Sequence, residues 1–120
     1  MAALTKDQIL GADDIHREEV TIPEWNGSVW IRVMSSADRD AWEASLMPAN
    51  GSGKPNMKNI RARLVARCAC DESGALLFAA NGADVEALGG KSCAALDRLF
   101  DAAQVVNRIR EEDVEELSKN

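Results

Sequence analysis

The residues that could carry chemistry in this chain are one histidine, three cysteines and one glycine-rich stretch. His16 is the only histidine, so a site with two histidine ligands cannot form. Cys68 and Cys70 make a C-x-C pair and Cys93 stands apart, which does not match the four-ligand spacing of structural zinc sites. We interpret the cysteines as small buried thiols and His16 as a solvated loop residue. The sequence therefore predicts no metal site.

The glycine-rich stretch Gly51-Ser52-Gly53-Lys54 has some features of a phosphate-binding loop. A Walker A loop follows a strand and continues with Ser or Thr after its lysine, whereas here Pro55 follows and a helix is expected before the stretch. The chain also lacks the G-x-S-x-G pattern of a nucleophile elbow. We therefore expect no catalytic residue, no cofactor-binding residue and no enzyme activity.

The charge balance disfavours nucleic acid as a partner. The chain has 20 acidic and 14 basic residues and a net charge of −6, and phosphate backbones repel such a protein. Arg61, Arg63 and Arg67 could form a basic helix face, which we interpret as a solvated surface. No run approaches the ~20 apolar residues of a membrane helix, and the first residues do not have the pattern of a secretory signal. We expect no membrane partner and a cytoplasmic protein.

The length and composition predict one domain over residues 1–120. With 46% apolar and 28% charged residues, such a chain can bury a core without disulfides. Thr5, followed by Gln8 in a capping-box pattern, predicts a short helix to Leu10 that Gly11 ends.

Two alternating apolar runs then flank Asn26-Gly27 and predict a β-hairpin. They include Val20 and Ile22 before the turn and Val29 to Val33 after it. Helical spacing of apolar residues follows. The expected class is therefore α+β, an N-terminal β-hairpin packed against a mainly helical bundle of four to five helices.

Five further helices are expected after the hairpin, the last of them loosely held, with a flexible loop rich in Gly, Ser and Pro at 48–55. A helix opening at Ser35-Ser36 places Trp42 and Leu46 on one face and ends at Pro48. A helix is expected at 56–69, and its apolar face comprises Met57, Ile60, Leu64, Val65 and Cys68. A short strand or extended segment at 75–78 and a helix at 81–88 capped by Asn81 follow. The last two expected elements are a loosely held acidic helix at 111–120 and, before it, a helix at 91–109 whose apolar stripe comprises Cys93, Leu96, Leu99, Phe100, Ala103 and Val106.

The hairpin supplies two candidate partner-binding residues, Trp25 and Trp30. In a regular strand Trp30 points away from Val29, Ile31 and Val33, so both faces of the hairpin carry apolar side chains. We expect helices to cover one face and a second protomer to cover the other.

The acidic C-terminus supplies two more candidates, Val114 and Leu117. They are the two apolar residues of the otherwise acidic segment from Glu111 to Leu117. One interpretation is a helix that docks in a partner's groove through them. The other is a frayed, solvated helix, as is common at chain ends.

The order of segments resembles the tail assembly chaperones of long-tailed, siphovirus-type bacteriophages. The resemblance runs from about Thr5 to Asn120, and no single motif carries it. The matching segments are Glu19–Gly27 with Val29–Val33, Ala37–Glu43, Asn59–Ala66, Cys70–Gly74, Asp84–Gly89 with Ser92–Ala103, and Glu111–Leu117.

The resemblance implies a protein of the host bacterial cytoplasm that is absent from the mature virion. It would bind the tape measure protein, keep that long helical chain soluble and help recruit tail tube (major tail) subunits. Further partners would be a frameshifted longer form of the same chain and other copies in a homo-oligomer. The alternatives are a structural head–tail or tail-completion protein of the virion, and a small DNA-binding regulator that uses Arg61, Arg63 and Arg67.

Overall fold

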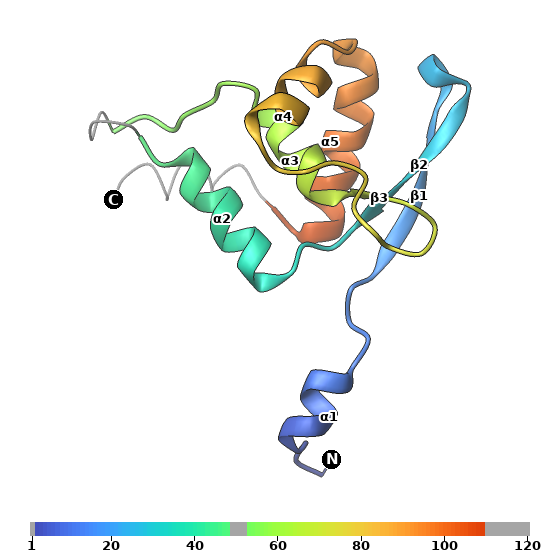
Figure 1. Cartoon of the computed structure of the whole chain (residues 1–120), viewed down its shortest axis with the longest axis vertical. Helices are drawn as coiled ribbons and strands as arrows, with labels where there is room; N and C mark the ends of the chain where they lie inside the picture. Colours follow the sequence, from blue (N-terminus) through green and yellow to red (C-terminus); the bar gives the residue numbers. More distant parts are fainter. Residues whose placement is uncertain (1, 49–52, 110–120) are drawn as a thin grey trace.

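The fold is organised around a β-hairpin whose second strand also pairs with a short third strand. The computed structural model describes residues 2–48 and 53–109. β1 (Arg17–Ile22) pairs antiparallel with β2 (Gly27–Arg32), and β2 pairs antiparallel with β3 (Ala69–Cys70). The helices are α1 (Lys6–Gly11), α2 (Ser36–Leu46), α3 (Ile60–Cys68), α4 (Gly82–Gly89) and α5 (Cys93–Asn107), as Figure 1 shows. The predicted α+β class is confirmed.

The hairpin connection is longer than a two-residue turn. A 3-10 turn, η1 (Pro23–Trp25), follows β1, since Pro23 has the fixed φ that suits the start of a helical turn. Asn26 then takes a left-handed conformation with φ +52° and donates its backbone N–H to the Pro23 carbonyl at 3.1 Å. Asparagine tolerates this conformation better than most residues do, so Asn26 reverses the chain and β2 begins at Gly27.

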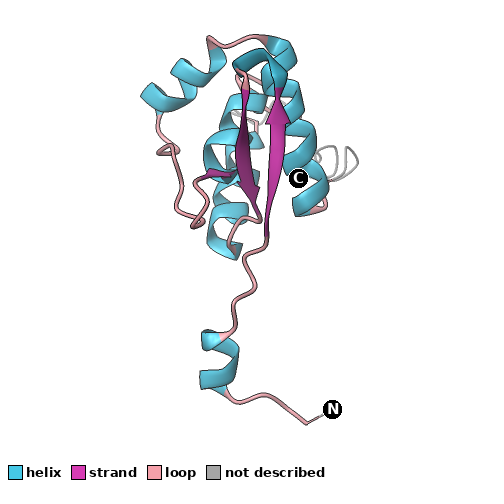
Figure 2. Ribbon diagram, turned by 90° about the vertical axis from the view of Figure 1, so that its right-hand side faces the viewer, coloured by secondary structure: helices cyan, strands magenta, loops and turns pink. Residues whose placement is uncertain are grey.

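The inner face of the hairpin packs against α5, and the helices lie behind the two long strands in Figure 2. In the strand register Val20 lies opposite Val29, and Ile22 lies on the same face. Ile22 and Ile31 are fully buried. The core also takes in α2 and α3; its largest other buried residues are Trp42, Leu46, Leu64, Leu99, Val65, Cys68 and Cys70. The prediction that Trp42 and Leu46 share a buried face is confirmed.

α3 begins at Ile60, four residues later than the sequence predicts. Asn56 accepts the Lys58 N–H through its side chain at 3.2 Å, and Asn59 is left-handed with φ +52°. Both features favour a turn over a helix. Met57 is therefore 51% exposed and not part of the apolar face of α3.

The end of α3 also differs from the prediction, because Ala69 and Cys70 leave the helix and form β3. Cys70 lies opposite Trp30, and its other side makes a single antiparallel bridge to Leu76. The Leu77 N–H donates to the Ala69 carbonyl at 3.0 Å. The predicted extended segment at 75–78 is thus present, pairing beside β3.

α4 carries the predicted cap at Asn81, and α5 has a cap at Ser92 that was not predicted from the sequence. The Asn81 side chain accepts the Asp84 N–H at 3.0 Å, and the Ser92 hydroxyl accepts the Ala95 N–H at 3.2 Å. α5 ends at Asn107, slightly before the predicted end, because Arg108 takes a left-handed conformation with φ +55°.

Two predicted segments fall wholly or partly outside the described residues. They are the loop at 48–55, of which residues 49–52 are not described, and the acidic helix at 111–120 with Val114 and Leu117.

Candidate partner-binding surfaces

Each of the three arginines of α3 binds another part of the same chain. Arg61 forms an ion pair with Asp97 of α5, which raises the pKa of Arg61 and lowers that of Asp97. Its guanidinium carbon also lies 6.0 Å from the centre of the Phe100 ring. Arg67 lies 3.3 Å from Asp38 of α2, whose other oxygen is 3.6 Å from Arg32.

Arg63 is used in a different way, as a clamp on the backbone. Its guanidinium donates to the carbonyls of Ser45 at 2.6 Å and Lys58 at 2.9 Å, and to the carbonyl of Asn56. Burial lowers the pKa of Arg63. Since each of the three arginines already has an internal partner, this helix offers a poor surface for phosphate groups, which counts against the regulator alternative.

Trp25 anchors the tip of the hairpin. It is half-buried and packs against the hydrophobic core. Beside it, Arg98 of α5 donates to both carboxylate oxygens of Glu24, at 2.8 and 3.2 Å, and this bond lowers the pKa of Glu24. Trp25 therefore has a structural role within the chain, and its role in partner binding stays a prediction.

Trp30 lies on the outer face of the hairpin, on the side away from α5. The register places it opposite Glu19 on one neighbour and Cys70 on the other, while Ile31 points into the core. The side chain is half-buried, and the Arg17 guanidinium carbon lies 5.9 Å from the ring centre. The predicted division of apolar residues between two faces is confirmed.

The chain itself covers part of this outer face, where we expected only a second protomer. The Arg17 Nε donates to the Glu72 carbonyl at 2.7 Å, and Arg32 donates to the Gly74 carbonyl at 3.0 Å. Asp71 closes this turn by accepting from the Ser73 hydroxyl at 2.6 Å and two backbone N–H groups, which lowers its pKa. The 71–75 turn is thus tied to the face that carries Trp30.

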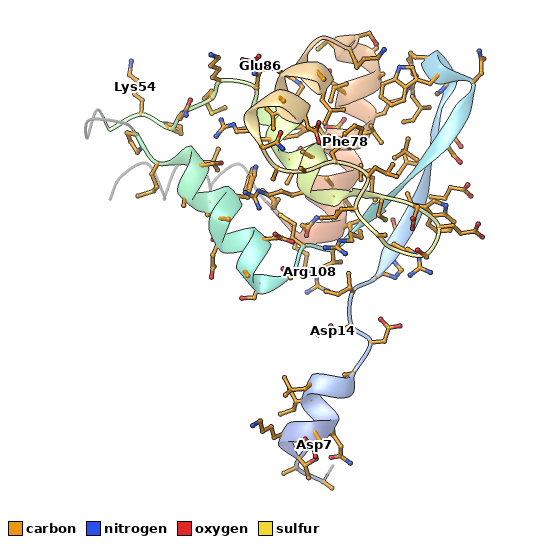
Figure 3. All side chains as sticks on the ribbon, viewed as in Figure 1. Asp7, Asp14, Lys54, Phe78, Glu86 and Arg108 are labelled. Carbon is orange, nitrogen blue, oxygen red and sulfur yellow. The ribbon has the colours of Figure 1, made fainter. Side chains whose placement is uncertain are left out.

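The N-terminal arm, residues 2–16, carries three strongly exposed apolar side chains. Every residue from Ala2 to Asp14 is exposed, and in Figures 1 and 2 α1 stands away from the body. The exposed fractions are 67% for Leu4, 57% for Ile9 and 75% for Leu10. Asp7 and Asp14 of the arm are labelled in Figure 3, which shows them clear of the other helices.

The arm helix is well capped but short. Thr5 and Gln8 form the predicted capping box, with bonds of 3.2 and 2.9 Å. A helix of six residues is still unstable alone in water, since helix nucleation costs more than so few bonds return. The free apolar side chains of α1 are therefore suited to packing against a partner.

A groove lies where α3, α4 and α5 begin or end. Its volume is about 220 Å³, and its lining is Met57, Asn59, Ile60, Arg61, Ala62, Gly89, Lys91, Cys93 and Leu96. A side-chain carbon on Gly89 would lie 2.9 Å from the Asn59 side-chain oxygen, so a larger residue at this position would require the Asn59 side chain to move. Sequence reasoning missed both this groove and the arm. The exposed arm has a local signal, a capped six-residue helix with the apolar residues Ile9 and Leu10. The groove has none, because three separate elements build it.

Catalytic and metal chemistry receive no support from the described residues. His16 is exposed and lies 3.1 Å from Glu18, as predicted for a solvated residue. Cys68 and Cys70 are buried, but Cys93 is exposed, so the buried-thiol prediction is wrong for Cys93. Within residues 2–48 and 53–109, no cluster of His, Cys, Asp and Glu could hold a metal ion.

The same described part of the chain has no helix long and apolar enough to cross a membrane. In the comparisons with known proteins, no family model, curated protein or solved structure matches the chain.

Proposed function

We propose that the chain is a tail assembly chaperone of a long-tailed bacteriophage. It would bind the tape measure protein in the host cytoplasm, keep it soluble, help recruit tail tube subunits and be absent from the mature virion. The name of the partner rests on the resemblance of the sequence. The observation that supports protein binding is the arm, where Leu4, Ile9 and Leu10 are all more than half exposed.

The physics of the arm suits a chaperone for a helical chain. A protein that holds an aggregation-prone partner must offer apolar surface and still stay soluble. Here the apolar residues lie on an exposed arm that also contains Asp13 and Asp14. The whole chain has a net charge of −6, which opposes non-specific self-association. An amphipathic partner helix could cover the apolar side of α1 and gain stability from it.

The direct test is co-expression of this chain with the tape measure protein of the same phage, followed by measurement of the soluble fraction. The matched variants are Leu10→Ser on the arm and Val105→Ser on α5, since the two residues are 75% and 76% exposed. We expect the native chain and the Val105→Ser variant to keep the tape measure protein soluble, and Leu10→Ser to lose much of this effect. A tape measure protein that is equally insoluble with and without the native chain would contradict the proposal.

The structural-protein alternative makes a different prediction about the virion. Mass spectrometry of purified particles should detect a head–tail or tail-completion protein and should not detect a chaperone. Pull-down with the tail tube protein, and with any frameshifted longer form, tests the remaining proposed partners.

A further inference from the structure

We propose that the outer edge of β1 binds an extended, basic segment of a partner protein, which adds to the sheet as a further strand. This inference goes beyond the proposed function, because it concerns a surface other than α1 and holds whichever protein supplies the segment. It rests on the strand order, the direction of the backbone groups of β1 and the charges beside them.

β1 is an edge strand of six residues. The strand order is β1-β2-β3, so β2 pairs with one side of β1, and within residues 2–48 and 53–109 no strand pairs with the other side. Apart from β2, the element that β1 mainly contacts is α5, which lies behind the hairpin in Figure 2. An open edge of this length can pair with another extended chain.

The hydrogen-bond pattern of the hairpin starts at His16. The Val33 N–H donates to the His16 carbonyl at 2.8 Å, so these two residues form a hydrogen-bonded pair. The next pair along the strands, Arg17 and Arg32, is of the other kind, because the two kinds alternate in an antiparallel ladder. The backbone N–H and C=O groups of Arg17 therefore face away from β2.

The same alternation continues through β1. Glu18 and Val20 bond to β2, whereas the backbone groups of Arg17, Glu19 and Thr21 face the open edge. In the described part of the chain, no other backbone group bonds to these outward N–H and C=O groups. Three residues thus present a row of donors and acceptors at the spacing that a further strand needs.

The charges beside this edge favour a basic partner. Residues 13–22 contain four carboxylates and one arginine, so their net charge is −3. The residues with these carboxylates are all exposed: Asp13, Asp14, Glu18 and Glu19. A lysine or arginine of an added strand, placed opposite Glu19, would have its Cβ about 5 Å from that of Glu19 and would form a favourable cross-strand pair.

A hollow at the start of β1 can hold a second basic side chain. Its volume is about 360 Å³, and its lining is Asp13, Asp14, Ile15, His16, Arg17 and Trp30. Because Arg17 donates to the Glu72 carbonyl, the two aspartates remain available to a cation from the partner. The stem of a lysine can pack on the Trp30 ring while its ammonium reaches these carboxylates. Figure 3 labels Asp14 at this place, between α1 and β1.

The same charges disfavour a second copy of this chain at the edge. Two β1 strands that paired antiparallel about Glu19 would bring the carboxylates of Glu18 and Glu19 of both copies together. Like charges on paired strands destabilise the pairing. The edge therefore discriminates between its own copy and a basic strand.

The test uses the full chain and a short peptide of alternating lysine and threonine, with amide hydrogen exchange measured by NMR. In the free chain, the amides of Glu18 and Val20 should exchange slowly and those of Arg17, Glu19 and Thr21 quickly. A saturating amount of the basic peptide should slow exchange at the three outward amides several-fold. A control peptide with glutamate in place of each lysine should leave the exchange rates unchanged.

Two variants separate backbone pairing from charge. Thr21→Pro removes an outward N–H and no bond to β2, and an edge strand accepts proline where the N–H faces solvent. This change should weaken binding of the basic peptide roughly tenfold. Glu19→Lys should weaken it roughly fivefold. The control Glu86→Lys makes the same charge change at an exposed position of α4 and should weaken binding much less.

Three results with the peptides would overturn the proposal. They are no binding of the basic peptide, binding that does not slow exchange at Arg17, Glu19 and Thr21, and equal binding of the acidic peptide. Slow exchange of these three amides in the chain without peptide would also overturn it. If that protection increased with protein concentration, the edge would belong to a second copy.

Discussion

The side chain of Asn107 is bonded to the backbone of Met34, with Oδ1 accepting the N–H at 2.7 Å. The same carboxamide donates to the Ala103 carbonyl at 2.9 Å and lies 3.5 Å from the Cys68 sulfur. The Asn107 carbonyl accepts from the Arg39 guanidinium at 3.0 Å. One residue at the end of α5 thus connects the segment after β2 with α2 and α3, in the region where the arm leaves the body.

Replacing Asn107 by leucine should lower the free energy of unfolding by about 1–3 kcal/mol, because the buried Met34 N–H loses its acceptor. Urea unfolding followed by circular dichroism measures this change. Asp101→Asn is the control, since Asp101 is exposed on the same helix. An Asn107→Leu variant as stable as the control would show that the bond to Met34 contributes little.

Replacing Arg63 by glutamine should destabilise the connection between α2 and α3. From α3, Arg63 donates to the Ser45 carbonyl near the end of α2 and to the carbonyls of Asn56 and Lys58 within the connection. Loss of these charge-assisted bonds should cost about 1.5–3 kcal/mol. The same variant should be cut faster by a protease between residues 46 and 60. Equal cutting rates for the variant and the native chain would contradict this assignment.

The sequence predicted the elements whose signals are local. The capping box of Thr5 and Gln8, the cap at Asn81 and the alternation around Trp30 each depend on neighbours within a few residues. Such local signals are sufficient to predict α1, α4 and the hairpin.

The errors arose where tertiary pairing overrides the local pattern. Ala69 and Cys70 continue the helical spacing of α3, yet they pair with Ile31 and Trp30 of a distant strand. Cys93 belongs to the apolar spacing of α5 but lies at its exposed first turn. The intramolecular partners of the basic residues of α3, such as Asp97, are far away in sequence, so no local pattern predicts them. The groove could not be predicted from the sequence either, because its lining residues are also far apart in sequence.

The three cysteines should react with a thiol reagent at very different rates. Burial raises the pKa of Cys68 to about 12 and also raises that of Cys70. The reactive form is the thiolate, so neither should react at neutral pH while the chain is folded. Cys93 is exposed and should react quickly. Ellman's reagent should therefore count one thiol in the native chain and three in urea. Three fast thiols without denaturant would contradict the burial of Cys68 and Cys70.

Stability should fall in acid because Glu24 of η1 and Asp97 of α5 are held in the charged form by arginines. Hydrogen bonds from Arg98 lower the pKa of Glu24, and the bond from Arg61 lowers that of Asp97. In the unfolded chain these two groups have ordinary pKa values. At a pH between the folded and unfolded pKa values, the unfolded chain therefore binds more protons than the folded chain. Their contribution is present above the unfolded pKa values of about 4 and is lost as the pH falls through the lower folded values.

The variant Arg98→Gln isolates one of these two contributions. The pKa of Glu24 then rises toward its ordinary value, because the bond from Arg98 is the largest cause of its lowering. The free energy of unfolding should therefore fall less steeply between about pH 5 and pH 2 than it does in the native chain. The effect at neutral pH should be small, because Arg98 is exposed and surface pairs contribute little. Lys6→Gln removes the same charge from the exposed arm and should leave the acid dependence unchanged. Urea unfolding at several pH values measures all three chains. Native and Arg98→Gln curves that run parallel would show that the Glu24–Arg98 pair does not contribute to stability in acid.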